Sequence, residues 1–174
     1  MASPELNDAL LAAAAQGSLA DIQSLLDRQA DVNARAADQS TPLHLATSNG
    51  HLQCIELLLD HRANVNARSA DYSTPLHLAA NNGHHQCIEP LLDRGASINA
   101  RDSADDTPLH RAAKRAHNRC VELLLDRGAN KLLYNVCGLT LHTWLAPFSL
   151  YRIAEPRRHS RSKQPRYNHC GSDP

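Results

Sequence analysis

Aromatic side chains are scarce in this chain of 174 residues: only 3% are aromatic, and Phe, Trp and Met each occur once. The hydrophobic fraction of 42% still allows a core, which must therefore be built from Leu, Ala, Ile and Val. The net charge is zero, because 18 Lys and Arg balance 18 Asp and Glu. This balance excludes a nucleic-acid-binding protein that depends on overall positive charge.

Signals for export and for common catalytic chemistry are also missing. The first residues include Pro4, Glu5 and Asp8 rather than a basic stretch and an apolar segment, so we expect no secretory signal. The odd number of cysteines, 5, indicates free thiols in a reducing compartment, cytoplasmic and/or nuclear. No glycine-rich phosphate loop, G-x-S-x-G or H-E-x-x-H motif is present. We therefore predict no enzyme and assign no catalytic, cofactor-binding or metal-ligating residue.

Charge and aromatic content divide the chain into two parts. Residues 1–130 carry 11 basic and 16 acidic side chains, whereas residues 131–174 carry 7 basic and 2 acidic ones. Tyr72 is the only aromatic residue of the first part. These shifts predict a boundary near Asn130.

A repeat with a period of 33 residues occupies the first part. The sequence Thr-Pro-Leu-His begins at three positions in register: Thr41, Thr74 and Thr107. A shorter Cys-Ile/Val-Glu motif keeps the same period, beginning at Cys54, Cys87 and Cys120. A degenerate first copy spans residues 9–33. This period and the T-P-L-H-x-A motif resemble the ankyrin-repeat family over about residues 5–130.

The resemblance implies an all-α ankyrin-repeat solenoid of about four repeats, with helix-turn-helix units, β-hairpin-like loops and an irregular C-terminal tail. We divide the chain into an N-terminal capping repeat, three further repeats, a degenerate C-terminal cap and a basic disordered tail. Their ranges are 1–33, 34–66, 67–99, 100–130, 131–155 and 156–174. One helix pair cannot bury its own apolar face, but stacked pairs can.

Local sequence signals agree with this architecture. Thr41 is a favourable N-cap residue, and Pro42 at the first helical position loses no hydrogen bond. Gly50 can adopt the left-handed conformation that ends a helix. Val65 and Ile98 are expected in short extended segments that lead to the next N-cap.

Some copies depart from the pattern. Pro90 stands inside a predicted helix, where it removes one backbone hydrogen bond and costs about 3 kcal/mol. Ala116 replaces a helix-ending glycine. Gln39, Tyr72 and Asp105 stand where the family usually has a loop glycine. These departures predict an array of modest stability.

The recurring cysteines and histidines are interpreted as structural. Cys54, Cys87 and Cys120 share one register in successive helices that pack about 8–10 Å apart, whereas a disulfide needs α-carbons within about 7 Å. In the family, the histidine of the Thr-Pro-Leu-His motif ties the helix start to its neighbours. His44, His77 and His110 therefore predict hydrogen-bonded ties rather than a metal site.

The resemblance also implies a function, because ankyrin repeats bind proteins through the loop tips and the exposed side of the first helices. We expect a non-catalytic adaptor or inhibitor, monomeric, that binds a partner protein and no nucleic acid. Tyr72 is the expected anchor, since tyrosine is enriched in interface hot spots. The partner-binding set consists of Asp38, Gln39, Ser40, Thr47, Ser48, Asn49, Asp71, Tyr72, Ser73, Asn81, Asn82, Asp105, Asp106, Arg111, Lys114 and Arg115. The aspartates are expected to form an acidic row at the loop tips, and the three cations a basic end.

Modification sites and two alternatives complete the predictions. Family resemblance makes Asn33, Asn66 and Asn99 candidates for hydroxylation, although a role in tying loops together would also explain them. Ser160 lies in a basic run typical of kinase sites, and the alternative is a solvated tail. One alternative function is a membrane-tethered protein anchored by residues 132–151, which have no charged residue. The other is a substrate-recognition subunit of a ubiquitin ligase.

Overall fold

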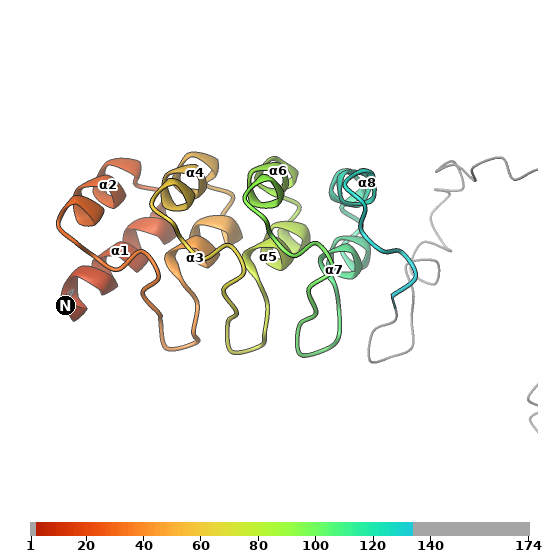
Figure 1. Ribbon diagram of the computed structural model, residues 1–174, viewed down its shortest axis with the longest axis horizontal. Coiled ribbons are helices and arrows are strands. Elements are labelled where there is room, and N and C mark those ends of the chain that lie inside the picture. Colours follow the sequence, from red (N-terminus) through yellow and green to blue (C-terminus); the bar gives the residue numbers. More distant parts are fainter. Residues whose placement is uncertain (1–2, 134–174) are drawn as a thin grey trace, which may run out of the picture.

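The computed structural model describes residues 3–133, which form four helical hairpins stacked in a row (Figure 1). The helices are α1 (Pro4–Gln16), α2 (Leu19–Asp27), α3 (Pro42–Ser48), α4 (Leu52–Asp60), α5 (Pro75–Asn82), α6 (His85–Asp93), α7 (Pro108–Lys114) and α8 (Asn118–Asp126). No strand occurs within residues 3–133. The predicted all-α solenoid is confirmed.

The helices form two rows. The first helix of each hairpin packs on the first helix of the next, so that α1, α3, α5 and α7 make an inner row. The second helices, α2, α4, α6 and α8, make an outer row in the same order. The loops that precede α3, α5 and α7 all project to the same side of the inner row (Figure 1). The repeat period therefore aligns equivalent residues along the array.

The helix boundaries follow from the predicted caps. Thr41, Thr74 and Thr107 are N-cap residues with extended backbone, and the proline that follows each opens the helix. Gly83 ends α5 with a φ of +78°, a left-handed conformation that glycine adopts without strain. At the equivalent position, Ala116 has a φ of +56°, and this left-handed conformation is strained because alanine has a β-carbon.

The prediction of short extended segments around Val65 and Ile98 is wrong. Both residues lie in turns, closed by the Ala67 N–H donating to the Asn64 carbonyl at 3.1 Å and the Ala100 N–H donating to the Ser97 carbonyl at 3.0 Å. The asparagine and serine side chains in these segments favour turns, because they offer local hydrogen bonds to the backbone.

The core is aliphatic, as the composition requires. Leu43, Leu76 and Ile88 are fully buried, and each buried leucine or isoleucine contributes roughly 1.5–3 kcal/mol. Small residues hold the inner helices close, with Ala46 and Ala79 fully buried between them. Pro90 does not break α6, which continues from His85 to Asp93 around it. The packing of α6 between α4 and α8 compensates for the missing backbone hydrogen bond.

Several predictions lie outside the described residues. They are most of the C-terminal cap segment 131–155, the basic tail 156–174 with Ser160, and most of the segment 132–151. Within residues 3–133, none of the helices has the length and apolar character needed to cross a membrane.

Candidate functional site

Three loops at the open side of the inner row form the most regular exposed feature. We call residues 36–40, 69–73 and 102–106 the fingertip loops. Each is closed by a backbone hydrogen bond from its first residue to its last, at 2.9–3.1 Å. Neighbouring loops are joined by the Ala70 N–H, which donates to the Asp38 carbonyl at 2.9 Å, and by the Ser103 N–H, which donates to the Asp71 carbonyl at 2.9 Å. The loops therefore form one connected row.

The tip of each fingertip loop carries backbone strain. Gln39, Tyr72 and Asp105 have φ values of +64°, +61° and +53°, which is the left-handed region that costs a non-glycine residue roughly 1–2 kcal/mol. Tyr72 is 54% exposed, and the Arg68 guanidinium lies 5.6 Å from its ring centroid. The bulkiest of the three side chains thus occupies a strained position and leaves its ring largely in solvent.

Arginines at one register support the loop row, although this role was not predicted from the sequence. The Arg35 guanidinium donates to the Gln39 carbonyl of its own loop at 3.1 Å and to the Arg68 carbonyl of the next at 2.9 Å. Arg101 lies 3.7 Å from Asp105. The signal was present, because Arg35, Arg68 and Arg101 recur with the period of 33.

Serine hydrogen bonds hold the aspartates of the first two loops. The Ser40 N–H and hydroxyl donate to Asp38 at 3.0 and 2.9 Å, and these bonds lower the pKa of Asp38 below its usual value. Partial burial raises the pKa of Asp71, but hydrogen bonds from Ser69 and Ser73 outweigh it and lower the pKa overall. Both carboxylates are exposed and ionised at neutral pH.

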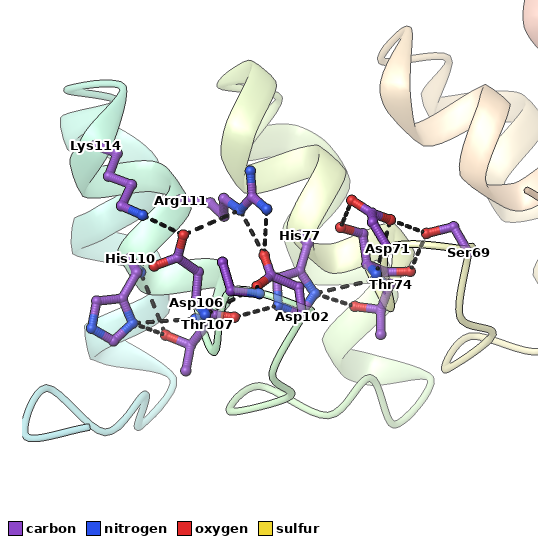
Figure 2. A network of polar contacts seen from close by, with 12 residues as sticks. Ser69, Asp71, Thr74, His77, Asp102, Asp106, Thr107, His110, Arg111 and Lys114 are labelled. Carbon is purple, nitrogen blue, oxygen red and sulfur yellow. Dashed lines mark hydrogen bonds and ion pairs between the residues drawn. The ribbon is translucent and has the colours of Figure 1, made fainter. Parts of the chain in front are cut away.

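The third loop is held by ion pairs (Figure 2). The Arg111 side chain of α7 contacts Asp102 at 2.7 Å through Nε and at 2.5 Å through Nη2. Lys114 pairs with Asp106, and Arg111 Nε lies 3.6 Å from the same carboxylate. Asp102 also accepts the N–H groups of Ala104 and Asp106 at 2.8 and 3.0 Å. Two buried carboxylates are thereby paired with two cations.

This network corrects two sequence predictions. Arg111 and Lys114 do not form a free basic end, because Asp102 and Asp106 neutralise them. Asp106 does not belong to an exposed acidic row, since it is only 2% exposed. Asp102 was not predicted from the sequence, because it lies nine residues before Arg111 and comes within reach only when the loop folds back onto α7.

Two of the three motif histidines, His44 and His77, form the predicted inter-repeat ties within residues 3–133. In the first, the Thr41 N–H donates to His44 Nδ1 at 3.2 Å, so the ring proton lies on Nε2, which donates to the Ser73 carbonyl of the next loop at 3.1 Å. His77 repeats this arrangement with Thr74 and the Asp106 carbonyl, at 3.2 and 3.0 Å. Burial lowers the pKa of both histidines. His110 accepts from Thr107 in the same way, but its Nε2 has no partner within residues 3–133 (Figure 2).

A second set of histidines ties each hairpin to the one before it. His84 Nε2 donates to the Ser48 carbonyl at 3.0 Å, and His117 Nε2 donates to the Asn81 carbonyl at 3.0 Å. The rings cover glycines: a β-carbon on Gly50 would lie 2.7 Å from His84, and one on Gly83 would lie 2.8 Å from His117. These glycines are therefore needed for space as well as for their positive φ.

The predicted partner-binding residues fall into three groups by exposure. The exposed ones are Asp38, Gln39, Asn49, Asp71, Tyr72, Asn82 and Arg115. The half-buried ones are Ser48, Asn81, Asp105, Arg111 and Lys114. The buried ones are Ser40, Thr47, Ser73 and Asp106. The structure removes the buried group from the candidate surface, because side chains 0–7% exposed cannot contact a partner.

The asparagines considered for hydroxylation tie neighbouring repeats together. Asn33 Oδ1 accepts the Asn64 N–H at 2.7 Å, Asn66 Oδ1 accepts the Ser97 N–H at 2.8 Å, and Asn99 Oδ1 accepts the Asn130 N–H at 2.9 Å. This geometry accounts for their recurrence. Their hydroxylation stays a prediction.

The three cysteines of the described repeats are buried and free, as predicted. Cys54, Cys87 and Cys120 are 1–2% exposed. Burial raises the pKa of Cys54, and it raises the pKa of Cys87 and of Cys120 to about 11, so these thiols stay protonated. Within residues 3–133, no group of three His, Cys, Asp or Glu side chains is arranged to hold a metal ion.

Comparison with known proteins agrees with the repeat architecture. A family model described as ankyrin repeats (3 copies) matches residues 9–102 and 63–135. No curated protein matches the chain.

Proposed function

Because the chain belongs to the ankyrin-repeat family, whose members are generally protein–protein interaction modules, we propose that it is a non-catalytic adaptor or inhibitor. Its partner protein would contact the fingertip loops and the exposed residues of the inner helices. We call this surface the binding face. It comprises Asp38, Gln39, Asn49, Asp71, Tyr72, Asn82 and Arg115.

The strained backbone and the exposed ring of Tyr72 are the observations that support this proposal most directly. A glycine at its position would avoid the strain of a φ of +61°, and the ring gains little burial, since it is 54% exposed. A strained residue that adds so little to the fold supports a role outside the fold. Tyrosine offers a partner a large rigid surface and a hydroxyl at low entropic cost. Tyr72 is therefore the proposed anchor.

The loops and inner helices offer both charged and apolar groups to a protein ligand. The Arg68 guanidinium lies over the Tyr72 ring, and Leu45 of α3 and Leu78 of α5 are half-buried. Asp38 and Asp71 supply fixed negative charge at the loop tips. An apolar centre with a polar rim is the usual anatomy of a protein interface.

One hollow of the described surface is lined by Asn66, Arg68, Thr74, Ser97, Ile98, Asn99 and Ala100. Arg68 is its only ionisable side chain, so this hollow holds no acid–base pair. Three buried thiols in a chain of odd cysteine count support a reducing location, cytoplasmic and/or nuclear.

The test compares Tyr72→Ala with Gln39→Ala, which changes the same register of the neighbouring loop. A partner is first identified by affinity capture and mass spectrometry, and its Kd is then measured with purified proteins. We expect Tyr72→Ala to weaken binding by about 30-fold or more, as a hot-spot residue does, and Gln39→Ala to have a much smaller effect. The helical circular dichroism should stay unchanged in both. Unaltered binding by Tyr72→Ala would refute the anchor role.

A further inference from the structure

The three arginines that precede the fingertip loops differ in what their guanidinium groups contact. Arg35 donates to two backbone carbonyls, and Arg101 lies 3.7 Å from the Asp105 carboxylate. The Arg68 side chain, at the same register, makes no hydrogen bond or ion pair within residues 3–133. It lies instead over the Tyr72 ring, with the guanidinium 5.6 Å from the ring centroid. The N–H groups of this guanidinium therefore lack an acceptor in the described part of the chain.

The residue four positions after each arginine explains this difference. It provides a backbone carbonyl at Gln39 and a carboxylate at Asp105, but an aromatic ring at Tyr72. A ring face attracts a guanidinium through its electrons and leaves the N–H groups at the edge of the guanidinium free to donate. Tyr72 thus restrains Arg68 without using its hydrogen-bond donors.

Arg68 also lines the hollow described above, which contains further donors and no carboxylate. Asn99 Oδ1 accepts the Asn130 N–H at 2.9 Å, and the NH₂ group of Asn99 donates to no other residue in the range 3–133. The Ser97 hydroxyl likewise makes no hydrogen bond among these residues. The hollow therefore combines one positive charge with two neutral groups that can donate hydrogen bonds. We call it the Arg68 hollow.

We propose that the Arg68 hollow binds the side-chain carboxylate of an aspartate or glutamate of the partner protein, next to the partner residue that packs on Tyr72. The planar guanidinium of Arg68 matches the two oxygens of a carboxylate and donates to both. Ser97 and Asn99 supply additional donors in the same hollow. This inference rests on the proposed binding function and adds the chemistry of the partner: an acidic residue close to an apolar or aromatic one.

Charge and exposure favour this occupant over a phosphorylated residue or a free small anion. Arg68 is the only ionisable side chain of the hollow, and it balances one negative charge. A phosphorylated residue carries nearly two negative charges and is usually held by several arginines. Arg68, Ser97 and Asn99 are exposed, so a small anion alone would bury little surface there. A protein that also covers Tyr72 excludes water from the ion pair and so strengthens it.

Selection of random displayed peptides on the full chain tests the proposal. We expect the wild type to enrich peptides with Asp or Glu at a fixed short spacing from an aromatic or large apolar residue. Arg68→Gln should lose the preference for the acidic residue and keep the other, whereas Tyr72→Ala should do the reverse. An acidic preference that survives in Arg68→Gln would overturn the proposal. Wild-type peptides without an acidic preference would overturn it too, but they would leave the proposed binding function intact. Enrichment of no peptide would also overturn the carboxylate site, and the captured partner would then decide the binding function separately.

Affinities of one enriched peptide give a second test, with Arg28→Gln as the matched control, because Arg28 is exposed and lies outside the hollow. We expect Arg68→Gln to raise the Kd about tenfold or more and Arg28→Gln to leave it nearly unchanged. A peptide whose acidic residue is replaced by the corresponding amide should bind wild type and Arg68→Gln equally. The melting temperature of Arg68→Gln should stay close to that of wild type, since the side chain donates no hydrogen bond within residues 3–133. Equal weakening of both peptides by Arg68→Gln would contradict the carboxylate site.

Discussion

Two threonines of the second repeat show how strongly position decides what a side chain contributes. Thr41 caps α3, and its Oγ1 lies 2.9 Å from His44 Nδ1. Thr47 lies in the same helix, fully buried, and its hydroxyl has no hydrogen-bond partner among residues 3–133. The equivalent residues of α5 and α7 are Ala80 and Ala113. Thr47 is therefore a cost to the fold, whereas Thr41 stabilises it.

Replacing Thr47 by alanine should stabilise the protein. An unpaired buried hydroxyl costs about 1–3 kcal/mol, and alanine also has the higher helix propensity, so the net gain after loss of the methyl contacts should be about 1 kcal/mol. Urea denaturation followed by circular dichroism measures it. Thr41→Ala serves as the opposite control and should lose about 1 kcal/mol. A destabilised Thr47→Ala variant would show that the methyl contacts outweigh the hydroxyl.

At the scale of elements, α7 and the third fingertip loop differ from their neighbours as a unit. Asp102, Asp106, Arg111 and Lys114 stand where the preceding repeat has Ser69, Ser73, Leu78 and Asn81. The four charges pair with one another across the loop and the helix. A loop held by serine hydrogen bonds in one repeat is thus held by ion pairs in the next.

Removing one partner of an ion pair in this unit should destabilise the protein more than removing both partners. Arg111→Leu restores the residue type of Leu78 but leaves the Asp102 carboxylate buried without its cation, which should cost about 3–5 kcal/mol. The double variant Asp102→Ser with Arg111→Leu should recover much of that loss. Chemical denaturation of wild type, both single variants and the double variant provides the comparison. Additive effects of the two single changes would contradict this coupling.

At the scale of the whole molecule, stability comes from contacts between neighbouring repeats. Each hairpin touches only the hairpins beside it, so the inter-repeat ties connect local units into one array. The ties include the buried rings of His44 and His77, which must stay neutral because Nδ1 accepts a backbone N–H. The stability of the repeat array therefore depends on pH through these histidine rings.

Stability should fall as the pH drops from 7.5 to 5.5. Burial lowers the pKa of His44 and His77 in the folded state, so below about pH 6.5 the unfolded chain binds more protons than the folded one. Below that pH, each of the two histidines lowers the free energy of unfolding by at most about 1.4 kcal/mol per pH unit. Asp38 and Asp71 do not interfere, because their pKa values lie below 3.8. Denaturation at several pH values measures the slope, which should be shallower for His77→Gln. A flat profile would contradict the role of these rings.

The amino-acid sequence by itself determined the repeat period, the starts and ends of the inner helices, and the buried register of Cys54, Cys87 and Cys120. These features depend on contacts within about four residues or on a period that the chain displays directly. The strained tips at Gln39, Tyr72 and Asp105 were predictable for the same reason, since a positive φ is a local property.

Only the tertiary structure decided which of the candidate residues reach solvent. Thr47 and Ser73 look like polar surface residues in sequence, but neighbouring repeats cover them. Asp102 meets Arg111, and His77 reaches the Asp106 carbonyl, across loops that come together only when the hairpins stack. Burial and ion pairing depend on atoms supplied by other segments, and no local pattern specifies which atoms these will be.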